Sequence, residues 1–201
     1  ISCSGYFLDT LEKKKFELND CQFSYRSSIF KKSLRNKFII TEVVLQLSKT
    51  NHKISKSYKS LNDALNKKKI HNPTIKDIAR IVSKIRENKL PNPSLIGNSG
   101  SFFKNPIVSI ELLNKLKQKF SKLVYFKESV SKYKLSAAWL IENCNFKNIE
   151  EKNVGVYKNQ ALVIINLGNA TGKEILLFSE KIKSTVLEKF DILLEEEVNI
   201  I

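Results

Sequence analysis

The sequence predicts an α+β fold, and three observations carry that prediction. Apolar residues recur at helical spacing in two stretches that begin with capping residues, 110–120 and 172–189. Two other stretches, 160–165 and 192–200, are strand-like. Turn-forming residues separate them. We therefore expect helices packed on a sheet.

The first 50 residues are expected to form strands. Short segments at 6–8 and 15–18 mix apolar and polar residues, which favours a β-hairpin, and Asn19-Asp20 marks the turn after it. Residues 38–47 have the highest β-branched content of this region. We expect them to form a strand with one face fully buried.

A helix is predicted over residues 73–88, after a polar, lysine-rich stretch at 51–69 that is typical of a surface loop. Asn72 would be its N-cap and Pro73 its first-turn proline. The stripe expected to face the core comprises Ile75, Ile78, Ala79, Val82 and Ile85. Two prolines then interrupt the chain at 90–93, which is the best candidate for a domain boundary and separates 1–88 from 89–201.

Residues 90–106 hold three of the four prolines and two of the six glycines, which predicts a shaped loop. Small residues at 97–101 would let another group approach the backbone closely, and Phe102 and Phe103 would anchor the loop to a core. The Ser101 hydroxyl is then a candidate catalytic group. An ordinary polar turn would show the same five small residues.

The C-terminal half alternates helices and strands. Ser109 can cap the helix at 110–120, and a second helix is expected over 137–143. Residues 154–157 and 160–166 are strand-like. Thr171 and Glu174 have capping-box spacing for the helix at 172–189, which leads into a final strand at 192–201.

Lysine dominates the charge of the chain. The formal net charge is +15, and only four of the 35 basic residues are arginines. The lysines are scattered, whereas nucleic-acid-binding proteins usually gather arginines beside stacking aromatic residues. We interpret them as a solvated surface that also attracts anionic substrates. A lysine-rich nucleic-acid-binding module is the rival interpretation, and strongly salt-dependent binding would distinguish it.

Cysteine and histidine spacing argues against disulfides and metals. Cys3, Cys21 and Cys144 show no C-x-x-C pattern, and His52 and His71 stand apart. These thiols fit a reducing cytoplasm. No apolar run approaches the roughly 20 residues that span a bilayer, so we expect a soluble chain. It starts at an isoleucine and contains no methionine, which indicates a piece of a longer sequence.

Residues 89–93 (KLPNP) and 97–106 (GNSGSFFKNP) together closely resemble the signature of the UDP-N-acetylenolpyruvoylglucosamine reductase family. Residues 23–30 (FSYRSSIF) are similar to the Y-R-x-S-x-F motif of that family. The resemblance therefore joins two segments that lie far apart in the chain.

Three further segments extend the resemblance to the C-terminus. Residues 134–142 (KLSAAWLIE) resemble K-L-x-A-G-W-L-I-E, with Ala138 in place of the family glycine. Residues 160–166 match Q-A-L-V-x-x-N. Residues 194–198 (LEEEV) are similar to L-E-P-E-V, with Glu196 in place of the family proline.

The resemblance implies three catalytic residues, Arg26, Ser101 and Glu197. It implies substrate-binding roles for Tyr25, Tyr58, Lys89, Asn105 and Gln160. Tyr58 would belong to the form of the family with a long insert, which the 75 positions between Arg26 and Ser101 also indicate.

The resemblance also implies a fold and a reaction. Residues 1–88 would be the C-terminal end of a PCMH-type FAD-binding domain, and 89–201 an α+β substrate-binding domain. The reaction would be NADPH-dependent reduction of UDP-N-acetylglucosamine enolpyruvate to UDP-N-acetylmuramate through FAD. The resemblance places this reaction in peptidoglycan synthesis, and so in the control of cell shape and division. The protein is expected to be a cytoplasmic monomer that binds neither nucleic acid nor membranes.

The chemistry of the implied residues suits an enolate intermediate. The guanidinium of Arg26 stays charged and matches a carboxylate bidentately. Ser101 would donate a proton to the charged carbon. Glu197 would stabilise the enolate only if it is protonated or shares a proton with the substrate.

No glycine-rich phosphate cradle occurs in the sequence. In the family the glycine-rich FAD loops precede the Tyr-Arg motif by many residues, so the main flavin-binding segment is missing here. Two interpretations stay open, since the upstream region is either absent from this sequence or absent from the gene. In the second case the chain would be a non-catalytic relic.

Overall fold

The computed structural model describes residues 1–54 and 58–201. Contacts divide the chain into two compact units, Ile1–Ser55 and Lys56–Ile201. In the described residues no helix has both the length and the apolar character needed to cross a membrane. The domain boundary expected between residues 88 and 89 stays a prediction.

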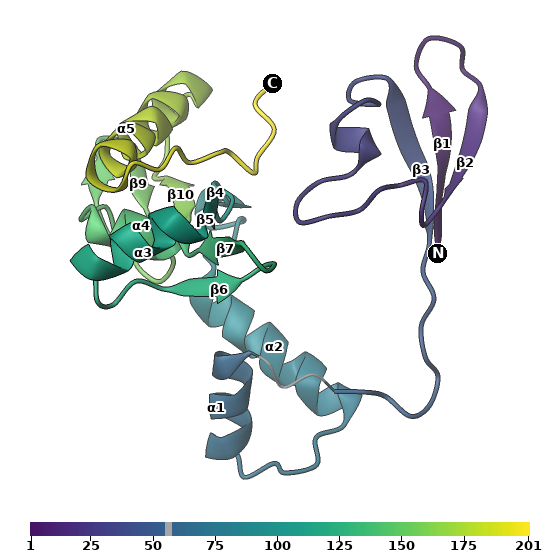
Figure 1. Ribbon diagram of the computed structural model, residues 1–201, viewed down its shortest axis with the longest axis horizontal. Coiled ribbons are helices and arrows are strands. Elements are labelled where there is room, and N and C mark those ends of the chain that lie inside the picture. Colours follow the sequence, from purple (N-terminus) through teal and green to yellow (C-terminus); the bar gives the residue numbers. More distant parts are fainter. Residues whose placement is uncertain (55–57) are drawn as a thin grey trace. The chain divides into compact units, whose positions relative to one another are not determined.

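The first unit is a three-stranded antiparallel sheet with the order β2-β1-β3 (Figure 1). Its strands are β1 (Ser2–Phe7), β2 (Lys13–Glu17) and β3 (Phe38–Val44). A short 3₁₀ helix, η1 (Ile29–Lys31), lies between β2 and β3 in the sequence. At Gly5 an added Cβ would come within 1.9 Å of the Ile39 carbonyl oxygen, so only glycine fits this bulge. The expected hairpin is confirmed.

Aromatic side chains fill the core of this unit, and Phe38 lies at its centre. The Phe38 ring contacts those of Phe7, Phe16 and Phe30 at centroid distances of 5.1, 5.2 and 5.6 Å. The predicted strand at 38–47 is confirmed over β3. The prediction that one face of this strand is fully buried is wrong, since every β3 residue after Phe38 is exposed. Phe38 is the one residue of β3 that belongs to the core of this unit.

The second unit begins with a helical hairpin of α1 (Lys59–Lys67) and α2 (Ile75–Lys89). Its small core comprises Leu61, Leu65 and Ile81. The polar stretch at 51–69, which was expected to be a surface loop, therefore contains helix α1. The predicted core stripe of α2 is partly wrong because the buried face centres on Ile81, while Ile75 and Val82 are exposed.

Helix α2 confirms the predicted helix but begins later than expected. Its N-cap is Thr74, not Asn72. The Thr74 hydroxyl oxygen accepts a hydrogen bond from the Asp77 N–H at 3.2 Å, and the Asp77 carboxylate accepts one from the Thr74 N–H at 2.9 Å. This reciprocal capping box satisfies two backbone donors, which makes Thr74 the more favourable start.

Two small antiparallel sheets form the rest of the second unit. One has the order β4-β10-β9-β8 and the other β5-β7-β6. The first contains β4 (Gly97–Ser101), β8 (Glu150–Glu151), β9 (Val154–Val156) and β10 (Val163–Asn166). The second contains β5 (Ile107–Ser109), β6 (Tyr125–Lys127) and β7 (Lys132–Leu135).

Three helices pack against these sheets around one core: α3 (Ile110–Lys119), α4 (Ala137–Asn143) and α5 (Gly172–Phe190). All three were predicted, and the caps at Ser109 and Thr171 are confirmed. Helix α5 contacts β9 and β10. The α+β prediction is therefore confirmed.

The final strand expected at 192–201 does not form. Ile192 and Leu194 are buried and Leu193 is 61% exposed, so the predicted alternation is present. Backbone pairing is limited to a single bridge between Glu196 and Phe103. The segment is extended without being part of a sheet ladder.

Candidate active site

Ser101 lies at the end of strand β4. This strand pairs antiparallel with β10, so that Ser101 stands opposite Val163 and Gly97 opposite Asn166. Gly100 interrupts the regular pairing with a φ of +74°, which glycine adopts without strain. The prediction of a loop is therefore wrong for residues 97–101, because pairing with β10 outweighs their weak β-propensity.

Phe102 and Phe103 anchor this strand to the core, as predicted. Their side chains are 5% and 1% exposed, and their rings lie 5.1 Å apart. The Phe102 N–H donates to the Leu162 carbonyl oxygen at 2.7 Å. Ser101, which is half-buried, is thus attached to a rigid part of the molecule.

Asn98 fixes the chain on the other side of Ser101. Its Nδ2 donates to the Ile96 carbonyl oxygen at 2.9 Å, and its Oδ1 accepts from the Gly100 N–H at 3.1 Å. The side chain therefore stabilises the backbone where the glycine bends it.

The backbone of Glu197 bonds to the residue that follows Ser101, although 96 positions separate Ser101 and Glu197. The Glu197 N–H donates to the carbonyl oxygen of Phe102, the residue after Ser101, at 2.8 Å. The Lys104 N–H donates to the Glu195 carbonyl oxygen at 2.9 Å. The serine motif and the C-terminal glutamates thus meet along one backbone pairing.

Lysine side chains fix the two glutamates that precede Glu197. Lys104 Nζ lies 3.0 Å from Glu195 Oε2, and Lys183 Nζ of α5 lies 2.8 Å from Glu196 Oε1. Partial burial alone would raise the pKa of Glu196, but the hydrogen bond from Lys183 and the charges of Lys183 and Lys104 lower it below its ordinary value. The hydrogen bonds to Glu196 and Glu180 raise the pKa of Lys183.

Sequence reasoning missed Lys183. One lysine among 31 carries no signal by itself. The available indication was the departure at Glu196, a charge where the family motif has proline, which requires a cation or solvent nearby.

Gln160 and Asn105 each accept a hydrogen bond from a backbone N–H. Gln160 belongs to the turn before β10, where its carbonyl oxygen accepts from the Val163 N–H at 3.0 Å. Asn105 Oδ1 accepts from the N–H of Ala137, the first residue of α4, at 2.9 Å, while Ser136 is the N-cap of that helix. The structure shows positions and local roles for both, and their contacts with substrate stay predictions.

Lys89 and Tyr58 come from the helical hairpin. Lys89 is the exposed last residue of α2, whose C-terminal end is tied to the turn before Gln160 because Asn159 Nδ2 donates to the Asn88 carbonyl oxygen at 3.0 Å. Tyr58 is the N-cap residue of α1, and its side chain is 76% exposed. An exposed tyrosine is available for a ligand, and the substrate-binding role of Tyr58 stays a prediction.

Tyr25 and Arg26 lie in the first unit, at the tip of a tight turn. Ser24 and Ser27 exchange two backbone hydrogen bonds of 3.0 and 3.1 Å, which leaves Tyr25 and Arg26 as the two turn residues. Arg26 has a φ of +52°, an unusual value for a non-glycine residue. The convergence of Arg26 with Ser101 and Glu197 stays a prediction, because Arg26 belongs to a different compact unit.

An open cavity of about 620 Å³ adjoins the serine strand. It is lined by Arg86, Glu87, Leu90, Pro91, Asn92, Pro93, Asn98, Ser99 and Gly100. Its walls therefore come from the end of α2, the proline segment and β4. Residues of two family-like segments, 89–93 and 97–106, therefore line this cavity, although none of the predicted site residues does.

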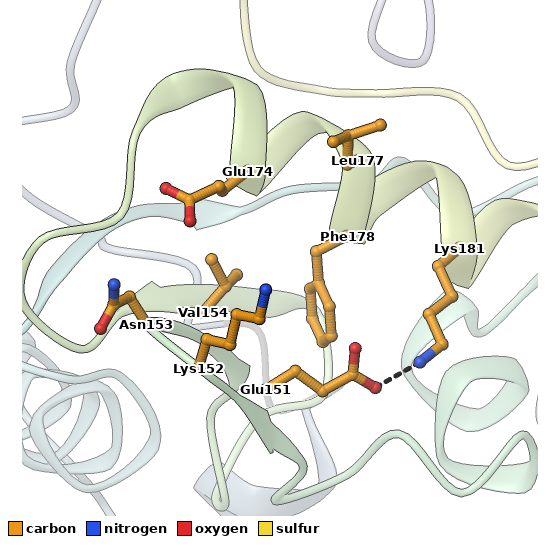
Figure 2. Close-up of a pocket in the computed structure, with 8 residues that line it drawn as sticks. All are labelled: Glu151, Lys152, Asn153, Val154, Glu174, Leu177, Phe178 and Lys181. Atoms are coloured by element: carbon orange, nitrogen blue, oxygen red, sulfur yellow. Dashed lines mark hydrogen bonds and ion pairs between the residues drawn. The ribbon is translucent and has the colours of Figure 1, made fainter.

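A second hollow, of about 310 Å³, lies between α5 and the turn from β8 to β9 (Figure 2). Its lining comprises Glu151, Lys152, Asn153, Val154, Glu174, Leu177, Phe178 and Lys181. Lys181 and Glu151 form an ion pair at its rim. Its lining lies outside every segment that resembles the family motifs, so it is not part of the candidate active site.

The described residues supply neither a metal site nor a flavin cradle. No group of three or more His, Cys, Asp or Glu side chains among them could hold a metal ion. Gly5 and Gly155 are packed inside sheets, where an added Cβ would approach a carbonyl oxygen within 1.9 and 2.7 Å. Gly100 and Gly168 have positive φ but stand far apart in the sequence. A glycine-rich loop for the FAD pyrophosphate is therefore not built by this part of the chain.

The sequence model of the protein family "UDP-N-acetylenolpyruvoylglucosamine reductase, C-terminal domain" matches residues 92–201. A reductase of that name from Flavobacterium johnsoniae is 45% identical over all 201 residues, which cover 60% of its length. The reductase of Amoebophilus asiaticus is 43% identical over 188 residues, 94% of this chain and 55% of that protein. The chain thus spans less than two thirds of these relatives.

The fold matches a solved structure with a TM-score of 0.57. That structure is UDP-N-acetylenolpyruvylglucosamine reductase from Thermus caldophilus, with 18% sequence identity. The match covers 98% of this chain and 51% of the other. At this identity the likeness concerns the fold alone.

Proposed function

Because the chain belongs to the UDP-N-acetylenolpyruvoylglucosamine reductase family, we propose that it forms the substrate side of an enzyme that reduces UDP-N-acetylglucosamine enolpyruvate to UDP-N-acetylmuramate. The observation that supports this most directly is the 2.8 Å bond from the Glu197 N–H to the Phe102 carbonyl oxygen. This bond connects the backbone segments of the two residues proposed to act on the enolate, Ser101 and Glu197. The product would enter peptidoglycan synthesis.

In an enzyme that also contains the upstream part found in the relatives, NADPH would be the reductant, and bound FAD would supply hydride to the methylene carbon of the enolpyruvyl ether. The flavin would be held chiefly by residues outside this chain, since the described residues build no phosphate cradle for it. The roles that follow therefore concern the substrate alone.

Arg26 would stabilise the negative charge that the substrate acquires. Charge on the carbon adjacent to the methylene spreads into the carboxylate, and a fixed guanidinium there lowers the energy of the enolate. The turn at Ser24 and Ser27 presents the Arg26 side chain at an exposed tip. Tyr25 would assist in holding the carboxylate.

Ser101 would give its hydroxyl proton to the charged carbon. A serine hydroxyl is a weak acid, so it requires hydrogen-bonding neighbours that stabilise its oxygen as the proton leaves. Glu197 would stand beside the carboxylate and share a proton with it. Lys89, Asn105, Gln160 and Tyr58 would bind the nucleotide sugar, and the excess of lysines would attract its phosphates.

A chimera can test this proposal. The 201 residues replace the corresponding 60% of the Flavobacterium johnsoniae reductase, which is 45% identical to them throughout. Stopped-flow absorbance then follows two events separately: bleaching of the flavin by NADPH and its reoxidation by the enolpyruvyl substrate. Size-exclusion chromatography of the same protein tests the expected monomeric state.

Ser101→Ala should leave bleaching intact and slow reoxidation at least about 100-fold, because general acid catalysis typically contributes that much or more. Ser94→Ala, at an exposed serine of the proline segment that does not line the cavity, is the control and should change neither step. Reoxidation of the Ser101→Ala chimera at the unchanged rate would refute the assignment of the proton donor. A chimera that binds flavin but never reacts with substrate would favour a non-catalytic relic.

A further inference from the structure

The side chain of Glu196 is tied to helix α5. Lys183 Nζ donates to Glu196 Oε1 at 2.8 Å and to Glu180 Oε1, one turn earlier on α5, at 2.9 Å. The Lys183 and Glu196 side chains are only 17% and 21% exposed, so water competes little for this ion pair. Both side chains are less exposed than those of the Lys134–Glu128 and Lys104–Glu195 pairs.

The backbone around Glu196 has only isolated attachments. A single bridge joins Glu196 to Phe103, and no sheet ladder extends it. The Glu197 N–H bond to the Phe102 carbonyl oxygen is the last backbone bond along this pairing. Terminal segments with so few bonds open locally without unfolding the rest of a domain. An additional anchor at Glu196 would therefore act directly on Glu197.

We propose that Lys183 and Glu196 are positioning residues that hold Glu197 against the Ser101 strand. The inference extends the proposed function, since it assigns these two residues a part in placing the acid for that reaction. Where the family motif has proline, a rigid backbone would limit the motion of the following glutamate. In this chain an ion pair to α5 does so instead.

Hydrogen exchange of the Glu197 amide, measured by NMR on the 201-residue chain, tests the positioning without any enzymatic activity. Lys183→Met keeps most of the side-chain volume and removes the charge. It should lower the protection of the Glu197 amide about fivefold, the effect of one such ion pair. The Phe102 amide, which bonds to Leu162 on the other side, should keep its protection.

Two variants make the result specific. Lys183→Arg keeps a cation at the same place and should restore the protection of the Glu197 amide. Lys181→Met, on the same helix but paired with Glu151, is the matched control and should leave it unchanged. Unchanged protection in Lys183→Met, or an equal loss in Lys181→Met, would overturn the positioning role.

The pH dependence supplies a readout that general packing would not give. Glu196 faces Lys183 and Glu180 from α5, and it also senses Lys104, which is paired with Glu195. Acid protonates Glu196 and breaks the pair, so the extra protection in the unmodified chain should disappear as the pH falls through the lowered pKa of Glu196. Lys183→Met should show no such step. A step of equal size in both chains would contradict the proposal.

The chimera separates this inference from the proposed function. Lys183→Met should slow flavin reoxidation by the substrate and leave bleaching by NADPH unchanged, and Lys183→Arg should recover the rate. If amide protection falls but reoxidation does not, the catalytic part of the inference is wrong. If the unmodified chimera is inactive, the proposed function fails, while the exchange experiment still decides whether the ion pair positions Glu197.

Discussion

Leu194→Ala should selectively destabilise the second unit. Leu194 is fully buried in the main core, three residues before Glu197. Removing a buried leucine side chain to Cβ typically costs about 2–5 kcal/mol, and we take about 3 kcal/mol here. For a unit of this size each kcal/mol lowers Tm by roughly 3 °C, so the expected decrease is about 9 °C.

Differential scanning calorimetry can check this value within one experiment. Leu193→Ala is the matched control, because Leu193 is the same residue type at the next position and is 61% exposed. Its effect should stay within about 0.5 kcal/mol. Phe16→Ala, in the core of the first unit, should instead lower the transition of that unit. Equal shifts in Leu194→Ala and Leu193→Ala would show that residues 192–198 are not packed as described.

Three further outcomes follow from local chemistry. Thr171→Ala should cost about 1 kcal/mol in urea unfolding by removing the α5 cap, and Thr171→Ser should recover most of it. Arg26→Val should destabilise the first unit by about 1–2 kcal/mol more than Arg26→Gly does. The reason is that residue 26 has a φ of +52°, which glycine adopts easily and a β-branched valine does not. Equal melting temperatures of the two variants would contradict this. Since the pKa of Glu196 is lowered by folding, its carboxylate adds stability above the unfolded pKa of about 4.3, and this is lost as pH falls through the lower folded pKa. The Tm difference between the unmodified chain and Glu196→Gln should therefore shrink on acidification, as thermal scans at several pH values would show.

Local signals predicted the helices well. Ser109 and Thr171 identified the starts of α3 and α5 because capping depends on residues only three positions apart. Strand β4 was not predicted, since its small residues have weak β-propensity and its partner β10 lies some 60 positions later. Helix α1 was not predicted, because its buried face has only Leu61 and Leu65 within a lysine-rich stretch.

The site was predicted differently from the fold. Ser101 and Glu197 were chosen from motifs that resemble a family, and the structure joins their segments through backbone bonds that no local pattern contains. The Lys183–Glu196 ion pair could not be predicted, because it depends on how α5 lies against residues 195–197. Long-range pairing of this kind depends on tertiary packing, whereas the periodicity of apolar residues predicts only local helices and strands.

The length of helix α5 determines where the C-terminal segment starts and in which direction it leaves the helix. It ends at Phe190, and Asp191, with a φ of +57°, turns the chain back toward Phe103. One residue inserted between Lys183 and Phe190 would rotate everything beyond it by about 100° and advance it by about 1.5 Å. Lys183 and Glu196 would then no longer meet, so this part of α5 should tolerate substitutions on its exposed face but neither insertions nor deletions.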